Sequence, residues 1–235
     1  MIEILRYQFG PLVGAAAQEI AQWQLIVILL FAVVMATTIH VFGHAWMADR
    51  LGDRTPRMQR RVSLSPFAHY DIVGLLMMVA TMLVGFPMGW GRPIRTNPEA
   101  YKVGRRLGIA MVAAAGPLTN FAAAALLSIP ARIMIAYLLR RGEVSELFLL
   151  AFITVIATIL VNLSLFIFNL VPVGPLDATH ILASALPTSI GETYRKFMMQ
   201  WGSYVLLVLM ASKAMPEFIG TMIRRLASLL IGIPF

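Results

Sequence analysis

The sequence TTIHVFGHAWMADRLGD at residues 37–53 decides the fold and chemistry of this chain, together with FNLVPVGPLDATHI at residues 168–181. The first stretch closes an apolar, proline-free run at 25–48, which predicts a helix. Residues four apart on a helix share a face, so His40 and His44 can bind one metal ion. The alternative is a pair of hydrogen-bonded core histidines. Ionisable groups in an apolar run are costly and usually functional, which favours the metal.

Composition places the chain in a membrane. Its 235 residues are 59% hydrophobic and 13% charged, with a mean hydropathy of +0.80. These values exclude an ordinary soluble domain. We predict an all-α polytopic membrane protein with about four to five transmembrane helices plus a re-entrant hairpin segment, forming one membrane domain over 1–235.

The net charge of +8 does not indicate nucleic-acid binding, because the basic residues lie in short loops between apolar runs. In that position they act as topology signals and contact anionic lipid headgroups. The cluster after the first helix predicts that the metal site lies towards the cytoplasmic side. The chain has no cysteine, which excludes disulfides and thiolate metal sites. The N-terminus lacks the pattern of a cleaved signal peptide.

The domain divides into an N-terminal interfacial segment at 1–23, a core at 25–185 and C-terminal helices at 186–235. Within the core, 72–88 is apolar but short and is flanked by arginines on both sides, which predicts a re-entrant hairpin instead of a span. The remaining predicted spans are 25–48, 107–139 and 147–170, followed by a broken span or helical hairpin.

Asp177 is the predicted third ligand. Pro172 and Pro175 end the preceding helix, and span counting returns Asp177 to the side of the membrane that holds His40 and His44. Two imidazoles and one carboxylate leave a fourth position for water, as in a catalytic zinc site. We therefore predict one zinc ion per chain, although the same ligands accept other divalent ions.

Four motifs in this order resemble the site-2 protease family of intramembrane zinc metalloproteases, over about residues 25–185. The motifs are His40 to His44 with 51–53, then 64–66 with His69 and Asp71, then 115–120, and finally 168–177. The resemblance implies a hairpin that pairs with an extended substrate. It also implies that Asn120 contacts substrate or polarises its carbonyl; an inter-helix hydrogen bond is the alternative for Asn120.

The chain departs from the family motif at the residue that handles protons. The family has His-Glu-x-x-His, in which the glutamate activates the zinc-bound water, whereas this chain has Val41. Valine cannot accept a proton, and general acid–base assistance is typically worth about 10²–10⁴-fold in rate. Two further departures follow the third ligand: Ala178 replaces glycine, and His180 replaces a common arginine.

These residues are compatible with three different functions. The first is a non-proteolytic homologue that keeps the metal and binds a transmembrane segment of another protein, as a binding or scaffold subunit of a membrane complex. The second is an active intramembrane endopeptidase with a substitute base; His69 could reach its cavity from the hairpin. The third is a structural metal site that His180 closes as fourth ligand.

Overall fold

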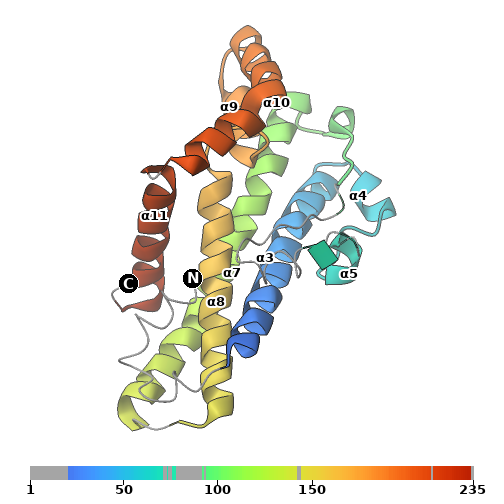
Figure 1. Ribbon diagram of the computed structural model, residues 1–235. Coiled ribbons are helices and arrows are strands. Elements are labelled where there is room, and N and C mark those ends of the chain that lie inside the picture. The colour runs from blue at the N-terminus through green and yellow to red at the C-terminus, as the bar shows by residue number, and fades with distance from the viewer. Residues whose placement is uncertain are drawn as a thin grey trace.

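The computed structural model describes residues 21–70, 73, 76–77, 92, 94–141, 144–212 and 214–233. The elements of these residues are helices (Figure 1). They are α3 (Gln22–Arg50), α4 (Thr55–Met58), α5 (Pro66–His69), η1 (Pro98–Ala100), α7 (Arg105–Arg141), α8 (Glu146–Asn169), α9 (Asp177–Ala185), α10 (Thr188–Ala211) and α11 (Ala214–Ile231).

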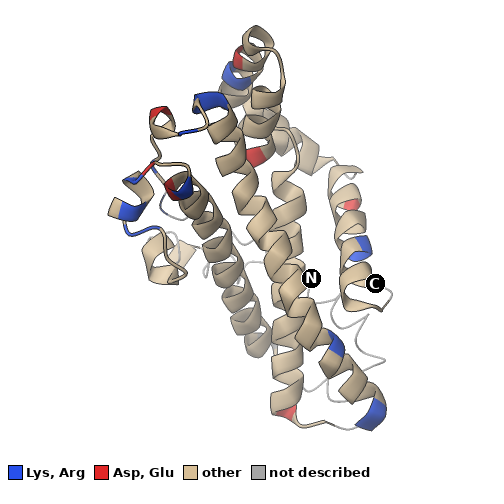
Figure 2. Ribbon diagram, turned by 180° about the vertical axis from the view of Figure 1, so that it is seen from behind, with Lys and Arg blue, Asp and Glu red and all other residues tan. Residues whose placement is uncertain are grey.

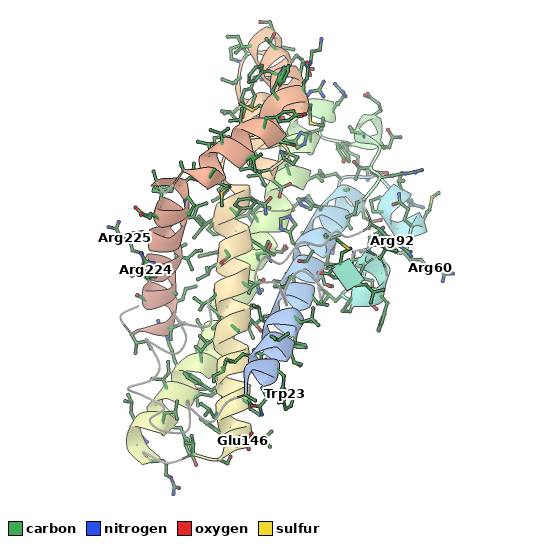
Figure 3. The ribbon with its side chains drawn as sticks, viewed as in Figure 1. Trp23, Arg60, Arg92, Glu146, Arg224 and Arg225 are labelled. Atoms are coloured by element: carbon green, nitrogen blue, oxygen red, sulfur yellow. The ribbon has the colours of Figure 1, made fainter. Side chains whose placement is uncertain are left out.

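Helices α3, α7 and α8 form the central bundle, with α11 along the other side of α8 (Figure 1). Small side chains on α3 and α7 face large ones on α8, which lets the helix axes approach closely in lipid. The fully buried residues at this helix contact are Ala32, Ala36, Ala124, Phe152, Ile156 and Ile159. Helix α11 buries Ala227 and Ile231, while Arg224 and Arg225 point away from α8 (Figure 3).

The long helices have the length and composition of membrane spans. Helices α3, α7 and α8 each qualify, and α10 with α11 adds a fourth if that pair, bent by 78°, counts as one span. Charged residues gather mainly towards the ends of the central bundle (Figure 2). At one end Gln24 donates a 3.0 Å hydrogen bond to Glu146, beside the exposed Trp23 (Figure 3). The prediction of an all-α polytopic membrane protein is confirmed.

Two predicted segments lie largely outside the described residues. They are the interfacial segment at 1–23, of which the structure describes only the last three residues, and the re-entrant hairpin at 72–88. Within the hairpin the structure describes Val73, Leu76 and Met77, which are helical. The hairpin's pairing with a substrate therefore stays a prediction.

A glycine sets the distance between α3 and α7. A Cβ atom on Gly43 would lie 2.7 Å from the Ala115 carbonyl oxygen and 2.9 Å from Cγ2 of Thr119, closer than side chains pack. At the same crossing the Thr119 hydroxyl is 3.1 Å from the Ile39 carbonyl, to which it donates. The helix that carries the histidines therefore lies directly against the backbone of α7.

We expect Gly43→Ala to destabilise the fold by about 1–3 kcal/mol, because the added methyl overpacks the α3–α7 contact. The measurement is the thermal unfolding midpoint of the purified chain in detergent, followed by far-UV circular dichroism. Gly220→Ala is the matched control, since a Cβ on Gly220 meets nothing closer than an arginine nitrogen at 3.4 Å. Equal midpoints for the two variants would show that the contact is not tight.

Candidate metal centre

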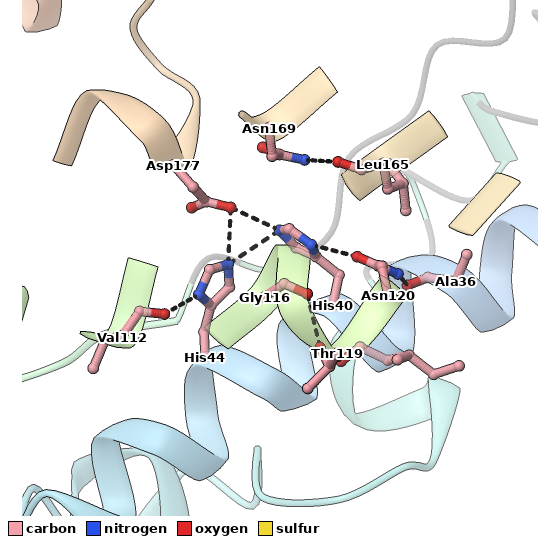
Figure 4. A network of polar contacts seen from close by, with 11 residues as sticks. Ala36, His40, His44, Val112, Gly116, Thr119, Asn120, Leu165, Asn169 and Asp177 are labelled. Carbon is pink, nitrogen blue, oxygen red and sulfur yellow. Dashed lines mark hydrogen bonds and ion pairs between the residues drawn. The ribbon is translucent and has the colours of Figure 1, made fainter. Parts of the chain in front are cut away.

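Three side chains meet at one point, as the sequence predicts (Figure 4). His40 and His44 come from α3, and Asp177 comes from the first residue of α9. The two Nε2 atoms are 3.0 Å apart, and Asp177 Oδ2 lies 3.2 Å from the first and 3.4 Å from the second. Ligand atoms around a tetrahedral zinc, with bonds of about 2.0–2.1 Å, are about 3.3–3.4 Å apart. The triangle therefore has nearly the size that zinc requires.

The tautomer of His40 follows from its neighbour Asn120. The Asn120 Nδ2 group donates to the Ala36 carbonyl at 2.9 Å and to Oδ1 of Asn162 at 2.8 Å. A carbonyl can only accept, so this contact fixes the orientation of the amide. Asn120 Oδ1 then faces His40 Nδ1 at 2.7 Å, and Nδ1 must carry the proton. This leaves the lone pair of Nε2 directed at the triangle.

A backbone carbonyl group orients the His44 ring. Its Nδ1 lies 2.7 Å from the Val112 carbonyl oxygen, which can only accept, so Nδ1 is the donor here too. Both Nε2 atoms of the neutral rings therefore present lone pairs. Asp177 Oδ2 is buried beside them and has no hydrogen-bond partner. Three electron-pair donors at this spacing repel one another, and a divalent cation between them removes the repulsion. The residues fit a zinc ion.

The loop that delivers Asp177 is held by α10. A Cβ on Gly202 would lie 2.6 Å from the Gly174 carbonyl oxygen, so the helix and the loop touch through backbone. The Tyr194 hydroxyl donates to the Pro172 carbonyl in the same loop. These two contacts fix the start of α9, and the carboxylate lies in its first turn, where the helix dipole favours negative charge.

Gly116 contributes to the site in a way that the sequence analysis missed. A Cβ at this position would collide with the His44 ring and lie 2.9 Å from Cε1 of His40. Only glycine lets α7 pass this close to both imidazoles. A glycine followed by Pro117 within a predicted helix is the available signal, since that pair is poor for helix formation without a local reason.

The site is not sealed. The side chains of His40, His44 and Asp177 remain 13%, 17% and 17% exposed, so the described residues do not enclose them completely. Among the described residues no second carboxylate joins the cluster. Glu99 forms an ion pair of 2.9 Å with Arg105 on the surface.

The other two histidines named by the sequence analysis have different surroundings. His69 is buried on α5, where Nε2 lies 2.6 Å from the Ser63 carbonyl. Burial lowers the pKa of His69 against the effect of that hydrogen bond, and Arg61 lowers it further. His180 lies three residues after Asp177 and lines a small cavity beside arginines. Burial also lowers the pKa of His180, against the Asp177 carboxylate, which raises it.

Membrane-length helices around two imidazoles and a carboxylate define a polytopic membrane protein with a candidate metal centre. The profile of peptidase family M50 matches residues 125–212. The putative zinc metalloprotease YwhC of Bacillus subtilis (strain 168) is 32% identical over 180 residues, which cover 77% of each chain. No solved structure matches. This chain belongs to peptidase family M50, which confirms the resemblance to site-2 proteases.

We expect Asn120→Ala to weaken zinc binding about 10–100-fold, because His40 loses the acceptor that fixes its tautomer. Competition against a fluorescent chelator measures the affinity. The matched control is Ser128→Ala on the same helix, whose hydroxyl donates to the Ala125 carbonyl at 2.7 Å and to no other group among the described residues. An unchanged zinc affinity in a folded Asn120→Ala protein would contradict the role assigned to Asn120.

Proposed function

We propose that this chain is a metal-binding member of peptidase family M50 that holds a transmembrane segment of a partner protein without hydrolysing it. It would serve as a binding or scaffold subunit of a membrane complex. One observation supports the proposal: three side chains that could hold a metal ion lie together with contacts that orient them, whereas the general-base position of the family motif holds Val41.

Binding and hydrolysis make different demands on such a site. A bound zinc ion supplies a Lewis acid for a carbonyl oxygen and lowers the pKa of its water ligand. His40, His44 and Asp177 are sufficient to hold that ion, but peptide hydrolysis also needs a group that carries the proton to the leaving nitrogen. Val41 lacks such a group, and no described carboxylate other than Asp177 joins the cluster.

The second candidate is an active intramembrane endopeptidase. The description of the Bacillus subtilis relative as a putative zinc metalloprotease favours it. It requires a base that replaces the missing glutamate. A closed structural site would require the His180 ring as fourth ligand, whereas that ring lines a separate cavity.

The orientation in the membrane is part of the proposal. The end of α3 that carries the histidines is followed by closely spaced arginines, which favour the cytoplasmic side. They are Arg50, Arg54, Arg57, Arg60 and Arg61. The metal centre and the segment that it binds would then lie near the cytoplasmic surface, in contact with anionic lipids.

We expect purified protein to contain one zinc ion per chain, and Asp177→Asn to reduce that occupancy strongly. Zinc binds unprotonated imidazole, so occupancy at limiting zinc should fall as the medium is made more acidic. Elemental analysis after gel filtration at several pH values provides the measurement. A metal-free chain at neutral pH with zinc supplied would contradict the metal centre itself.

We expect the unmodified, zinc-loaded chain to leave a transmembrane peptide intact, and Val41→Glu to cleave it at least about 10²-fold faster than the unmodified chain. The assay follows fragment formation by mass spectrometry in detergent micelles. Val41→Gln is the matched control, because its amide resembles glutamate in size but cannot accept the proton. If the unmodified chain cleaves the peptide and His40→Ala abolishes that cleavage, the chain is an active peptidase.

A further inference from the structure

A cavity of about 120 Å³ with several charged side chains in its lining lies between α9 and the N-terminal parts of α7 and α10. The ends of these three helices gather at one end of the molecule (Figure 1). The lining of the cavity includes Arg105, Arg106, Ile109, His180, Glu192 and Arg195. None of them is a metal ligand.

The three atoms His40 Nε2, His44 Nε2 and Asp177 Oδ2 form what is called here the metal triangle. On each of two helices, a residue of the cavity lies about one turn from a residue that forms or orients this triangle. On α9, His180 is three residues after the ligand Asp177. On α7, Ile109 is three residues before Val112, whose carbonyl orients His44. One helical turn rises about 5.4 Å, whereas an extended chain advances about 3.3 Å per residue. A peptide backbone at the metal would therefore bring a side chain about two residues away to this cavity.

The lining carries three guanidinium groups and the carboxylate of Glu192. Arg105 is also paired with Glu99 at 2.9 Å, so Arg106 and Arg195 are the cations left to share Glu192, and the net charge stays positive. The Arg106 group is held in place, since Nε donates to the Ser184 carbonyl at 2.8 Å and Nη1 donates to the Thr188 hydroxyl at 3.0 Å. Arg195 is oriented through Nε and Nη2 by Glu192. A guanidinium has five N–H donors, so both arginines keep donors for a ligand.

The His180 ring adds a polar group that the described part of the chain leaves without a hydrogen-bond partner. Oriented arginines with spare donors bind carboxylates well, because their fork matches the two oxygens. The volume is far below the roughly 300–1,000 Å³ of pockets that hold whole small molecules, and suits one side-chain group.

We propose that this cavity is a subsite for a carboxylate, carried by an aspartate or glutamate about two residues from the residue held at the metal. The inference rests on the proposed function, since it names the chemistry of the bound segment. The cavity lies about one helical turn from the metal triangle on two helices. An extended peptide that reaches both places needs this spacing, whereas a lipid headgroup does not, so the spacing favours a peptide.

The test uses the zinc-loaded full chain in uncharged detergent micelles. The probes are fluorescein-labelled Leu/Ala-rich membrane-spanning peptides with a central Gly-Gly break, in which a single glutamate is moved along the sequence, and matched peptides with glutamine. Fluorescence anisotropy measures binding. We expect one glutamate position to bind at least about 10-fold more tightly than its glutamine counterpart, as for a charge-assisted hydrogen bond.

Arg106→Gln and Arg195→Gln should each remove that preference, whereas Arg60→Gln, an exposed residue that does not line the cavity, should keep it. Arg195→Gln is the variant that loses the fewest structural contacts, since within the described part of the chain its guanidinium donates only to Glu192, one turn away. Thermal midpoints of all three variants show whether the fold is intact.

The outcomes separate the two proposals. Equal binding of glutamate and glutamine peptides at every position overturns the subsite and leaves the proposed function standing. If no peptide binds, the proposed function fails and the subsite fails with it. In lipid nanodiscs, a response of Arg106→Gln and Arg195→Gln to phosphatidylglycerol, with no change in peptide preference, would make the cavity a lipid site and overturn the proposal.

Discussion

The structure depends on where the imidazole protons are. Both Nδ1 protons are committed, one to the Asn120 amide oxygen and one to the Val112 carbonyl, so both Nε2 lone pairs meet the carboxylate of Asp177. With both rings neutral and no cation this arrangement is repulsive, and with a divalent cation it would be a three-ligand site with an open position. The close passage of α7 past the histidines, through Gly116, is the backbone condition for it.

The same contacts also hold the helices together. Asn120 on α7 bonds the Ala36 carbonyl of α3 and the Asn162 side chain of α8, and Asn162 donates to the Thr158 carbonyl at 2.8 Å. In hydrocarbon an unsatisfied amide is costly, so these bonds fix how the three helices associate. The orientation of His40 is therefore coupled to the packing of the central bundle, and metal affinity should respond to changes at that packing contact.

The sequence predicted the central helices from apolar runs of membrane length. It predicted that His40, His44 and Asp177 lie together from the four-residue spacing of the histidines and from span counting, which returns Asp177 to their side of the membrane. The role of Asn120 was left open, since an amide in an apolar run can face a ligand or a neighbouring helix; here it is fully buried with its polar atoms engaged. The part played by Val112 was not predictable, because a backbone carbonyl can belong to any residue. The contact of Gly202 with the loop before Asp177 depends on tertiary packing, and a single glycine in the sequence does not indicate which segment packs against it.

The loss of the base need not disturb the rest of the site. The contacts that orient His40 and His44 come from Asn120 and Val112, and position 41 takes no part in them. Replacing a proton-transfer group by valine therefore removes a rate term and leaves ground-state binding to the metal largely unchanged. Such a site would bind an extended segment at the metal and a neighbouring carboxylate through oriented arginines. Because the segment would not be cleaved, it would stay bound for longer. In the proposed function, valine at position 41 would change the role of the site from cleaving a bound segment to holding it.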